Sequence, residues 1–180
     1  IPTEVEVASE FRYRNPIITP TTLVVAVSQS GETADTLAAI RDARIKGAKV
    51  FGITNVIGSP VARESDGVIY TKANKEIAVA STKSFIGQVV SLTLLAMLLG
   101  RSKGKLTLNM TRMLFSELAD TADQIEAILD DTSAIEEAAH FFDGRSSTLY
   151  IGRGLGEAVC YEGALKLKEI SYIHAEAYAA

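Results

Sequence analysis

The chain has 180 residues and a net charge of −4 at pH 7, from 18 basic and 22 acidic side chains. This length allows one sizeable core or one and a half small α/β units, and the charge, with no basic stripe, argues against a nucleic-acid partner. The one cysteine, Cys160, excludes an internal disulfide and fits a reducing compartment, and the two histidines and this cysteine are too scattered for a metal site.

Strands and helices alternate along the first hundred residues. We expect strands at residues 4–7, 23–28, 49–54 and 67–70, and helices at 9–14, 33–46, 60–64 and 81–99. Gly47 suits the position just after a helix, and Pro60 suits a first helical turn. Alternation of this kind predicts an α/β fold with a parallel sheet covered by helices on both faces.

The most apolar stretch, residues 85–99, is interrupted by Gly87, Gln88, Ser91 and Thr93. It is also shorter than the roughly 20 residues that a membrane span needs. We therefore interpret it as a helix buried on most sides, in a core or a subunit interface, and we expect no membrane partner. The N-terminus carries no secretory signal pattern, so we expect a cytoplasmic protein.

A polar hinge at residues 101–105 separates these elements from a second set. Helical spacing at 106–129 and 133–142 is followed by a loop at 143–147, a strand at 148–151 and a helix at 157–172. We divide the chain into a first lobe at residues 1–103, a connecting helix at 104–131, and the start of a second, similar lobe at 132–180. Because the chain opens within an apparent strand and closes without a cap or tail, we expect a fragment whose two lobes are truncated at their outer ends.

The glycine-rich segment 152–156 follows the strand of the second lobe. Its sequence, GRGLG, resembles the dinucleotide-binding turn G-x-G-x-x-G, but the third glycine comes too early and no acidic residue can be checked downstream. A turn that lets a helix pack close to its strand is the better interpretation. No cofactor is therefore expected.

The turn 28–33, with the sequence SQSGET, joins a buried strand to a helix. Backbone N–H groups and the hydroxyls of Ser28, Ser30 and Thr33 would meet at the positive end of that helix, which suits a phosphate. A helix N-cap with a tight turn would use the same residue types, so both interpretations stay open. Glu32 places a negative charge within the turn and must point away or be paired.

Two further segments could carry chemistry. Residues 79–83 open the long helix with hydroxyl groups. Glu162, Lys166 and Glu169 fall at i, i+4 and i+7 and so share one face of the last helix, whereas Lys168 points elsewhere as a solvated charge. A surface ladder of ion pairs would have the same spacing, with Glu162 preceding Lys166 in the favourable order.

Three segments closely resemble the isomerase, or SIS, portion of the glucosamine-6-phosphate synthase family, the glutamine–fructose-6-phosphate aminotransferases. They are SQSGET, EIAVASTKSF and EGALKLKEISYIHAEAY. The first alone indicates only the wider SIS superfamily, whereas the third extends over seventeen residues in register. The resemblance covers the chain from VASEFRYR to AEAYAA.

The resemblance implies a homodimeric enzyme that makes glucosamine 6-phosphate from fructose 6-phosphate and ammonia, which a glutaminase domain of the parent chain releases from glutamine. It implies two SIS lobes, each a parallel sheet flanked by helices. The substrate-binding residues that it implies are Ser28, Gln29, Ser30 and Thr33 for the phosphate, and Val79 (through its backbone) and Ser81 for the sugar.

The resemblance also implies that Glu169 moves a proton between C1 and C2, with Lys166 beside it and Glu162 supporting the hydroxyl or water chemistry. Conversion of a ketose imine to an aldose amine needs such a carboxylate, and a neighbouring ammonium can stabilise developing oxyanion charge. His174, Lys166 and Lys168 do not match the family's ring-opening histidine or Schiff-base lysine, which lie outside this chain. We therefore expect the chain alone to be inactive.

Two other functions are compatible with the hydroxyl-rich turn. A sugar-phosphate-sensing SIS module would bind a phosphosugar without needing the Glu162–Lys166–Glu169 face. Another SIS sugar-phosphate isomerase or deglycase would differ in the sugar phosphate that it converts.

Overall fold

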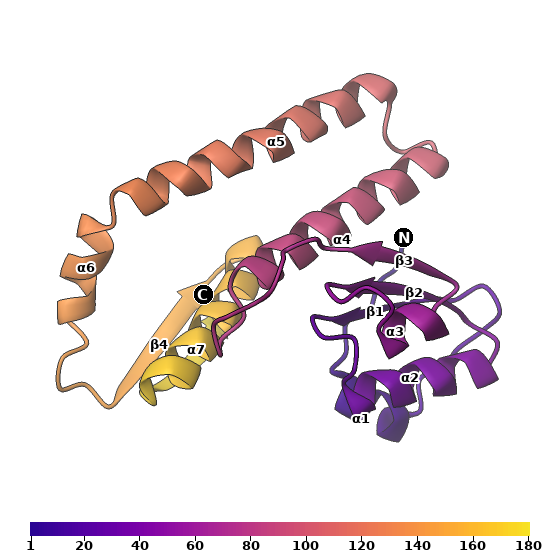
Figure 1. Ribbon diagram of the computed structural model, residues 1–180, viewed down its shortest axis with the longest axis horizontal. Coiled ribbons are helices and arrows are strands. Elements are labelled where there is room, and N and C mark those ends of the chain that lie inside the picture. The colour runs from indigo at the N-terminus through magenta and orange to yellow at the C-terminus, as the bar shows by residue number, and fades with distance from the viewer. The chain divides into compact units, whose positions relative to one another are not determined.

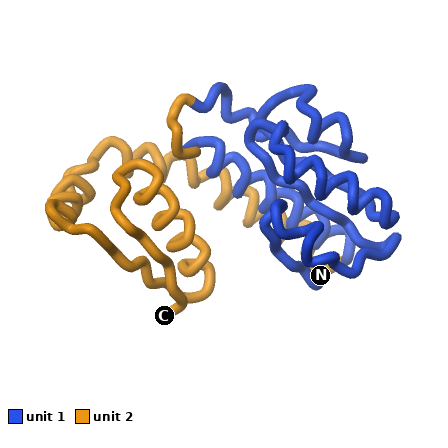
Figure 2. Tube along the Cα trace, turned by 90° about the horizontal axis from the view of Figure 1, so that it is seen from below, with its two compact units in different colours: residues 1–76, 82–103 blue, residues 77–81, 104–180 orange.

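The computed structural model describes residues 1–180, which form two compact units (Figure 2). Unit 1 comprises residues 1–76 and 82–103, and unit 2 comprises residues 77–81 and 104–180. The chain therefore leaves unit 1 for five residues and returns to it before the long helix begins.

Unit 1 is built on a three-stranded parallel sheet with the order β1-β2-β3 (Figure 1). Its elements are α1 (Ala8–Arg14), β1 (Leu23–Ser28), α2 (Ala34–Ile45), β2 (Lys49–Thr54), α3 (Pro60–Glu64), β3 (Gly67–Tyr70) and α4 (Lys83–Ser102). Leu23 pairs with Lys49, and Phe51 pairs with Gly67. This confirms the expected α/β fold with helices packed on a parallel sheet.

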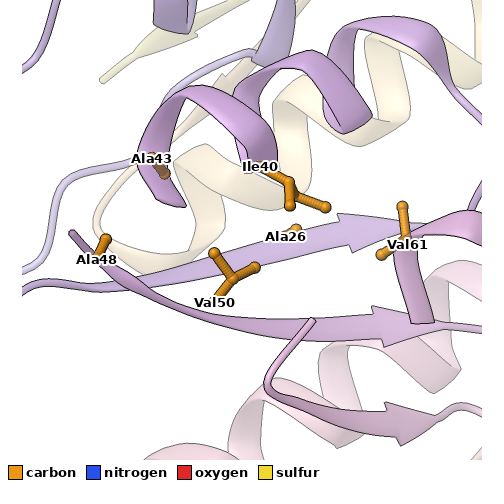
Figure 3. Close-up of a cluster of buried hydrophobic side chains, with 6 residues drawn as sticks. All are labelled: Ala26, Ile40, Ala43, Ala48, Val50 and Val61. Atoms are coloured by element: carbon orange, nitrogen blue, oxygen red, sulfur yellow. The ribbon is translucent and has the colours of Figure 1, made fainter. Parts of the chain in front are cut away.

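The core of unit 1 lies where α2 and α3 cover the sheet (Figure 3). Its buried members are Ala26, Ile40, Ala43, Ala48, Val50 and Val61. Ile53 is also fully buried, although alternation along β2 places it on the opposite face from Val50. Both faces of the central strand are thus covered, as parallel sheets require.

The expected strand at residues 4–7 was wrong. This segment has no regular structure, and the first element is α1, which packs against α2. Val5 and Val7 are the apolar residues of the segment, and both side chains are largely exposed. Without burial or a neighbouring strand, their alternation with glutamates is not enough to fix an extended conformation.

Helix α4 is longer and less buried than the sequence predicted. It spans 20 residues and contacts β2, but its buried residues are confined to Ser84, Ser91, Leu95 and Met97. One side packs on the sheet and much of the rest is exposed in the single chain, so of the two expected settings burial within the core of this chain is wrong, and burial in a subunit interface stays a prediction. By length and composition alone this single helix could cross a membrane, a criterion that core helices of soluble proteins also meet.

Unit 2 contains two helices followed by a parallel β-α-β unit. The elements are α5 (Leu108–Asp130), α6 (Ser133–His140), β4 (Ser147–Gly152), α7 (Leu155–Ser171) and β5 (His174–Ala179). Strands β4 and β5 pair in parallel, and α7 packs on both. The sequence analysis missed β5, because HAEAYA lacks the β-branched residues that mark a strand.

The glycine-rich turn after β4 brings α7 close to its strand. A Cβ at Gly152 would lie 2.5 Å from the carbonyl oxygen of Gly156 and 2.7 Å from Sγ of Cys160. A side chain at this position would push the first turns of α7 away from β4. The interpretation of this turn as a packing device is confirmed.

Candidate functional site

The turn 28–33 lies at the carboxyl edge of the sheet in unit 1. It follows β1 directly and leads into α2, while residues 55–59 follow the adjacent strand β2. The backbone N–H of Asn55 donates to the carbonyl oxygen of Gln29 at 3.0 Å, which ties the two turns together. Ligands of open α/β sheets commonly bind at this edge.

Ser28 and Ser30 organise the turn from within. The Oγ of Ser28, a buried side chain, accepts a hydrogen bond from the N–H of Gly31 at 3.1 Å and lies 3.3 Å from Oγ1 of Thr33. The Oγ of Ser30 accepts from the N–H of Glu32 at 3.3 Å. Ser28 therefore shapes the turn, whereas Ser30 is half-buried and remains within reach of solvent.

Gly31 is required for the close approach between this turn and the next one. Its φ is +67°, and a Cβ there would lie 2.2 Å from Oγ of Ser59 and 2.7 Å from Oγ1 of Thr54. Thr54 and Ser59 are both buried, and their hydroxyl oxygens lie 3.4 Å apart. These two residues support the turn, and the sequence analysis missed them because their hydroxyls come from a different strand and helix start.

The N-terminus of α2 is not capped by a side chain. Thr33 occupies the N-cap position with extended backbone angles, but its hydroxyl accepts no backbone hydrogen bond. Of the alternative interpretation, the tight turn and the N-cap position of Thr33 are confirmed, but a cap by its side chain is wrong, and the free N–H groups of the first helical turn stay available. Glu32 is exposed and its carboxylate has no partner, so it is not paired within the turn.

The N-terminus of α4 already has its anion. The carboxylate of Glu76 accepts hydrogen bonds from the backbone N–H of Ser84 at 3.1 Å, and from the N–H and hydroxyl of Thr82 at 3.2 Å each. These bonds, with the Ser84 N–H first among them, lower the pKa of Glu76 to about 2. Of the hydroxyls predicted at this helix start, that of Thr82 donates to Glu76, whose carboxylate caps the helix, and Glu76 itself carried no recognisable signal in the sequence.

The two residues predicted to line the sugar lie in the segment Ile77–Ser81. The side chain of Val79 is 99% exposed, which is compatible with a role through its backbone alone. Ser81 is half-buried, and its hydroxyl has no hydrogen-bond partner. Both belong to unit 2, whereas the flanking Glu76 and Thr82 belong to unit 1.

On α7, the predicted face of charged residues is formed. The Nζ of Lys166 lies 3.2 Å from Oε1 of Glu162 and 3.1 Å from Oε2 of Glu169. Desolvation acts to lower the pKa of Lys166, but the hydrogen bonds to Glu169 and then Glu162 outweigh it and raise this pKa. Lys168 is exposed and forms no ion pair, as expected.

The predicted site residues therefore form two groups, each within its own unit. The turn 28–33 brings its four predicted residues together in unit 1. The face Glu162–Lys166–Glu169 is assembled in unit 2, where a central ammonium holds two carboxylates. The first arrangement can receive an anion at a helix N-terminus, and the second places two carboxylates, either of which can act as a base, beside an ammonium.

Comparison with known proteins agrees with the resemblance to the SIS superfamily. A family model for the SIS domain matches residues 1–98. The chain belongs to the SIS domain family. This match covers all the strands of unit 1 and the turn 28–33.

The similarity extends over the whole chain in individual relatives. The chain is 56% identical over 180 residues to the glutamine–fructose-6-phosphate aminotransferase (isomerizing) of Symbiobacterium thermophilum, and 51% identical over 180 residues to that of Caldanaerobacter subterraneus. The C-terminal domain of glucosamine-fructose-6-phosphate aminotransferase from Francisella tularensis matches 99% of the chain with a TM-score of 0.96 and 41% identity.

The chain is shorter than these relatives. It spans 30% of the length of the two aminotransferases and 51% of the solved Francisella domain. The resemblance to the aminotransferase family is confirmed along the chain.

Proposed function

We propose that this chain is part of the isomerase domain of a glutamine–fructose-6-phosphate aminotransferase. In that domain it takes part in converting fructose 6-phosphate and glutamine-derived ammonia to glucosamine 6-phosphate. The observation that carries this proposal is the 56% identity over all 180 residues, which includes the 82 residues beyond the end of the SIS match at residue 98. A shared SIS fold alone would not extend to α7 and β5 at this level of identity.

The phosphate of the substrate would bind at the turn 28–33. The hydroxyl of Thr33 is exposed and that of Ser30 is half-buried but within reach of solvent, the side-chain amide of Gln29 has no internal partner, and α2 begins with unused N–H groups. Ser28, with its hydroxyl committed to Gly31, would hold the shape of this cradle. A phosphate at this place gains from hydrogen bonds and from the positive end of the helix.

The proton transfer would be carried out on the charged face of α7. Glu169 is the more exposed of the two carboxylates and would remove a proton at C1 of the sugar and return one at C2. The ammonium of Lys166, 3.1 Å from this carboxylate, would stabilise negative charge on the sugar oxygen. Glu162, on the other side of Lys166, would fix the position of the ammonium.

We further propose that the parent polypeptide carries a glutaminase domain and acts as a homodimer. The coverage of only 30% of the relatives supports a longer parent, and their names contain glutamine as the nitrogen donor. The exposed apolar side chains of α4, such as Ile86, Val89 and Leu98, support a surface that is covered in the assembled protein.

The proposal is tested by incubating the parent polypeptide with fructose 6-phosphate and glutamine. Glucosamine 6-phosphate is the expected product, identified by mass spectrometry. Binding of fructose 6-phosphate without any product would instead indicate a sensing module, and conversion of a different sugar phosphate would indicate another SIS isomerase or deglycase.

A further inference from the structure

Asn55 connects three segments at the carboxyl edge of the sheet in unit 1. Its backbone N–H donates to the carbonyl oxygen of Gln29 in the turn after β1. Its side-chain Oδ1 accepts from the hydroxyl of Thr71 and from the N–H of Ala73, each at 2.9 Å. Its Nδ2 donates to the carbonyl oxygen of Asn74 at 2.6 Å. One half-buried side chain thus satisfies three groups of the segment that follows β3.

The backbone of this segment needs such support. Lys72 has φ of +53° and Asn74 has φ of +56°, so two of three consecutive residues adopt the left-handed conformation without being glycine. Such a conformation is unfavourable for residues with a side chain, and it persists where surrounding contacts hold it. The three hydrogen bonds from Asn55 fall on Thr71, Ala73 and Asn74, directly at and beside the strained positions.

The supported segment leads to the proposed sugar-binding residues. It continues to Glu76, whose carboxylate is bound by Thr82 and Ser84 at the start of α4. Residues Ile77–Ser81 therefore form a loop between Glu76 and Thr82, which are hydrogen-bonded to each other. The entry to this five-residue loop is fixed on one side by Asn55 and on the other by the first turn of α4.

We infer that Asn55 is a positioning residue that holds residues 71–74, which lead into the proposed sugar-binding residues Val79 and Ser81, and so determines how well the sugar part of the substrate is held. This inference rests on the proposed function, in which Val79 and Ser81 line the sugar. The link to the phosphate turn runs through the backbone N–H of Asn55, which survives any substitution except proline. The link to residues 71–74 runs through the side chain, which a substitution removes or changes.

This difference separates a positioning role from a general structural one. Removing the side chain should weaken binding of the sugar but leave the phosphate turn intact. If the role of Asn55 were purely structural, its substitution would lower the stability of the protein. It would then weaken binding of the phosphate and of the sugar equally, or leave both unchanged.

The experiment uses the parent polypeptide and measures KM and kcat for fructose 6-phosphate, together with the inhibition constant of inorganic phosphate as a competitive probe of the turn. For Asn55→Ala we expect KM to rise about tenfold, the effect of about one net hydrogen bond, while kcat and the phosphate inhibition constant change by less than about threefold. Asn55→Asp keeps the acceptor for Thr71 and Ala73 but places a carboxylate oxygen, itself an acceptor, against the carbonyl oxygen of Asn74, so its KM should also rise above the wild-type value.

Asn15→Ala is the matched control. Asn15 also uses its side-chain oxygen, which accepts from Nζ of Lys46 at 2.9 Å, but it lies at the end of α1. We expect wild-type kinetic constants for this variant. If Asn55→Ala does not fold, Asn55→Asp supplies the comparison.

Two results would overturn the inference. One is an unchanged KM in a folded Asn55 variant, and the other is a parallel rise in KM and in the phosphate inhibition constant. Absence of glucosamine 6-phosphate formation by the wild-type polypeptide would refute the proposed function instead, so the two failures are distinguishable.

Discussion

The double substitution Ser30→Ala and Thr33→Ala in the parent polypeptide should weaken fructose 6-phosphate binding by about 2–4 kcal/mol. The structure leaves both hydroxyls within reach of a ligand, since Thr33 does not cap α2 and Ser30 is only half-buried. A hydrogen bond to a charged group contributes about 1.5–3 kcal/mol, and water replaces part of two such bonds. The dissociation constant should therefore rise by a factor of about 30 to 1,000.

Titration calorimetry with fructose 6-phosphate measures this effect directly, and circular dichroism establishes that the variant is folded. Thr93→Ala is the matched control, because Thr93 is exposed on α4 and its hydroxyl donates only to the carbonyl oxygen of Val89. We expect unchanged affinity for the control. Unchanged affinity in a folded double variant would refute the assignment of the phosphate to the turn 28–33.

Three further substitutions test other parts of the account. Gly31→Ala should destabilise the protein by at least about 2 kcal/mol in urea unfolding, because a Cβ would lie 2.2 Å from Oγ of Ser59 at a φ of +67°; wild-type stability would contradict this. The pKa of Glu76, about 2 against 4.5 unperturbed, means that its cap stabilises α4 above pH 4.5 and is lost as the pH falls toward 2. The protection of the amides at the start of α4 against hydrogen exchange, relative to the intrinsic rate at each pH, should fall over this range, and Glu76→Gln should abolish this pH dependence. Lys166→Gln should lower turnover by about a hundredfold, whereas Lys168→Gln should not; equal effects would argue for a mere ion-pair ladder.

The central strands of unit 1 could be predicted closely from the sequence. Strands β1 and β2 are continuous apolar runs followed by turn residues, and their predicted bounds agree with the structure. The short length of these runs and the turn residues that flank them distinguish them from helices. The predictions for residues 4–7 and for β5 were wrong for opposite reasons. Residues 4–7 alternate as a strand does, but their apolar side chains are not buried. Strand β5 pairs with β4, but its sequence lacks the residues that are typical of a strand.

The site was predictable only where its residues are close in sequence. The spacing of Glu162, Lys166 and Glu169 fixes a shared helix face, and the two ion pairs confirm that they share it. Asn55 acts on the segment that follows β3, at separations of 16 to 19 residues for its side chain, and Glu76 binds the start of α4 across the loop 77–81. Contacts of this kind depend on how the chain folds back on itself, so no local pattern announces them.

The account depends most on Glu169 as the base that moves a proton on the sugar. The most direct test is turnover of fructose 6-phosphate and glutamine by the parent polypeptide in deuterated water, for the wild type and for Glu169→Gln, with a binding titration alongside. We predict that wild-type glucosamine 6-phosphate carries deuterium at C2, and that the variant binds the substrate but turns over about two to four orders of magnitude more slowly. Wild-type rates of product formation and deuterium incorporation in the Gln variant would contradict the account.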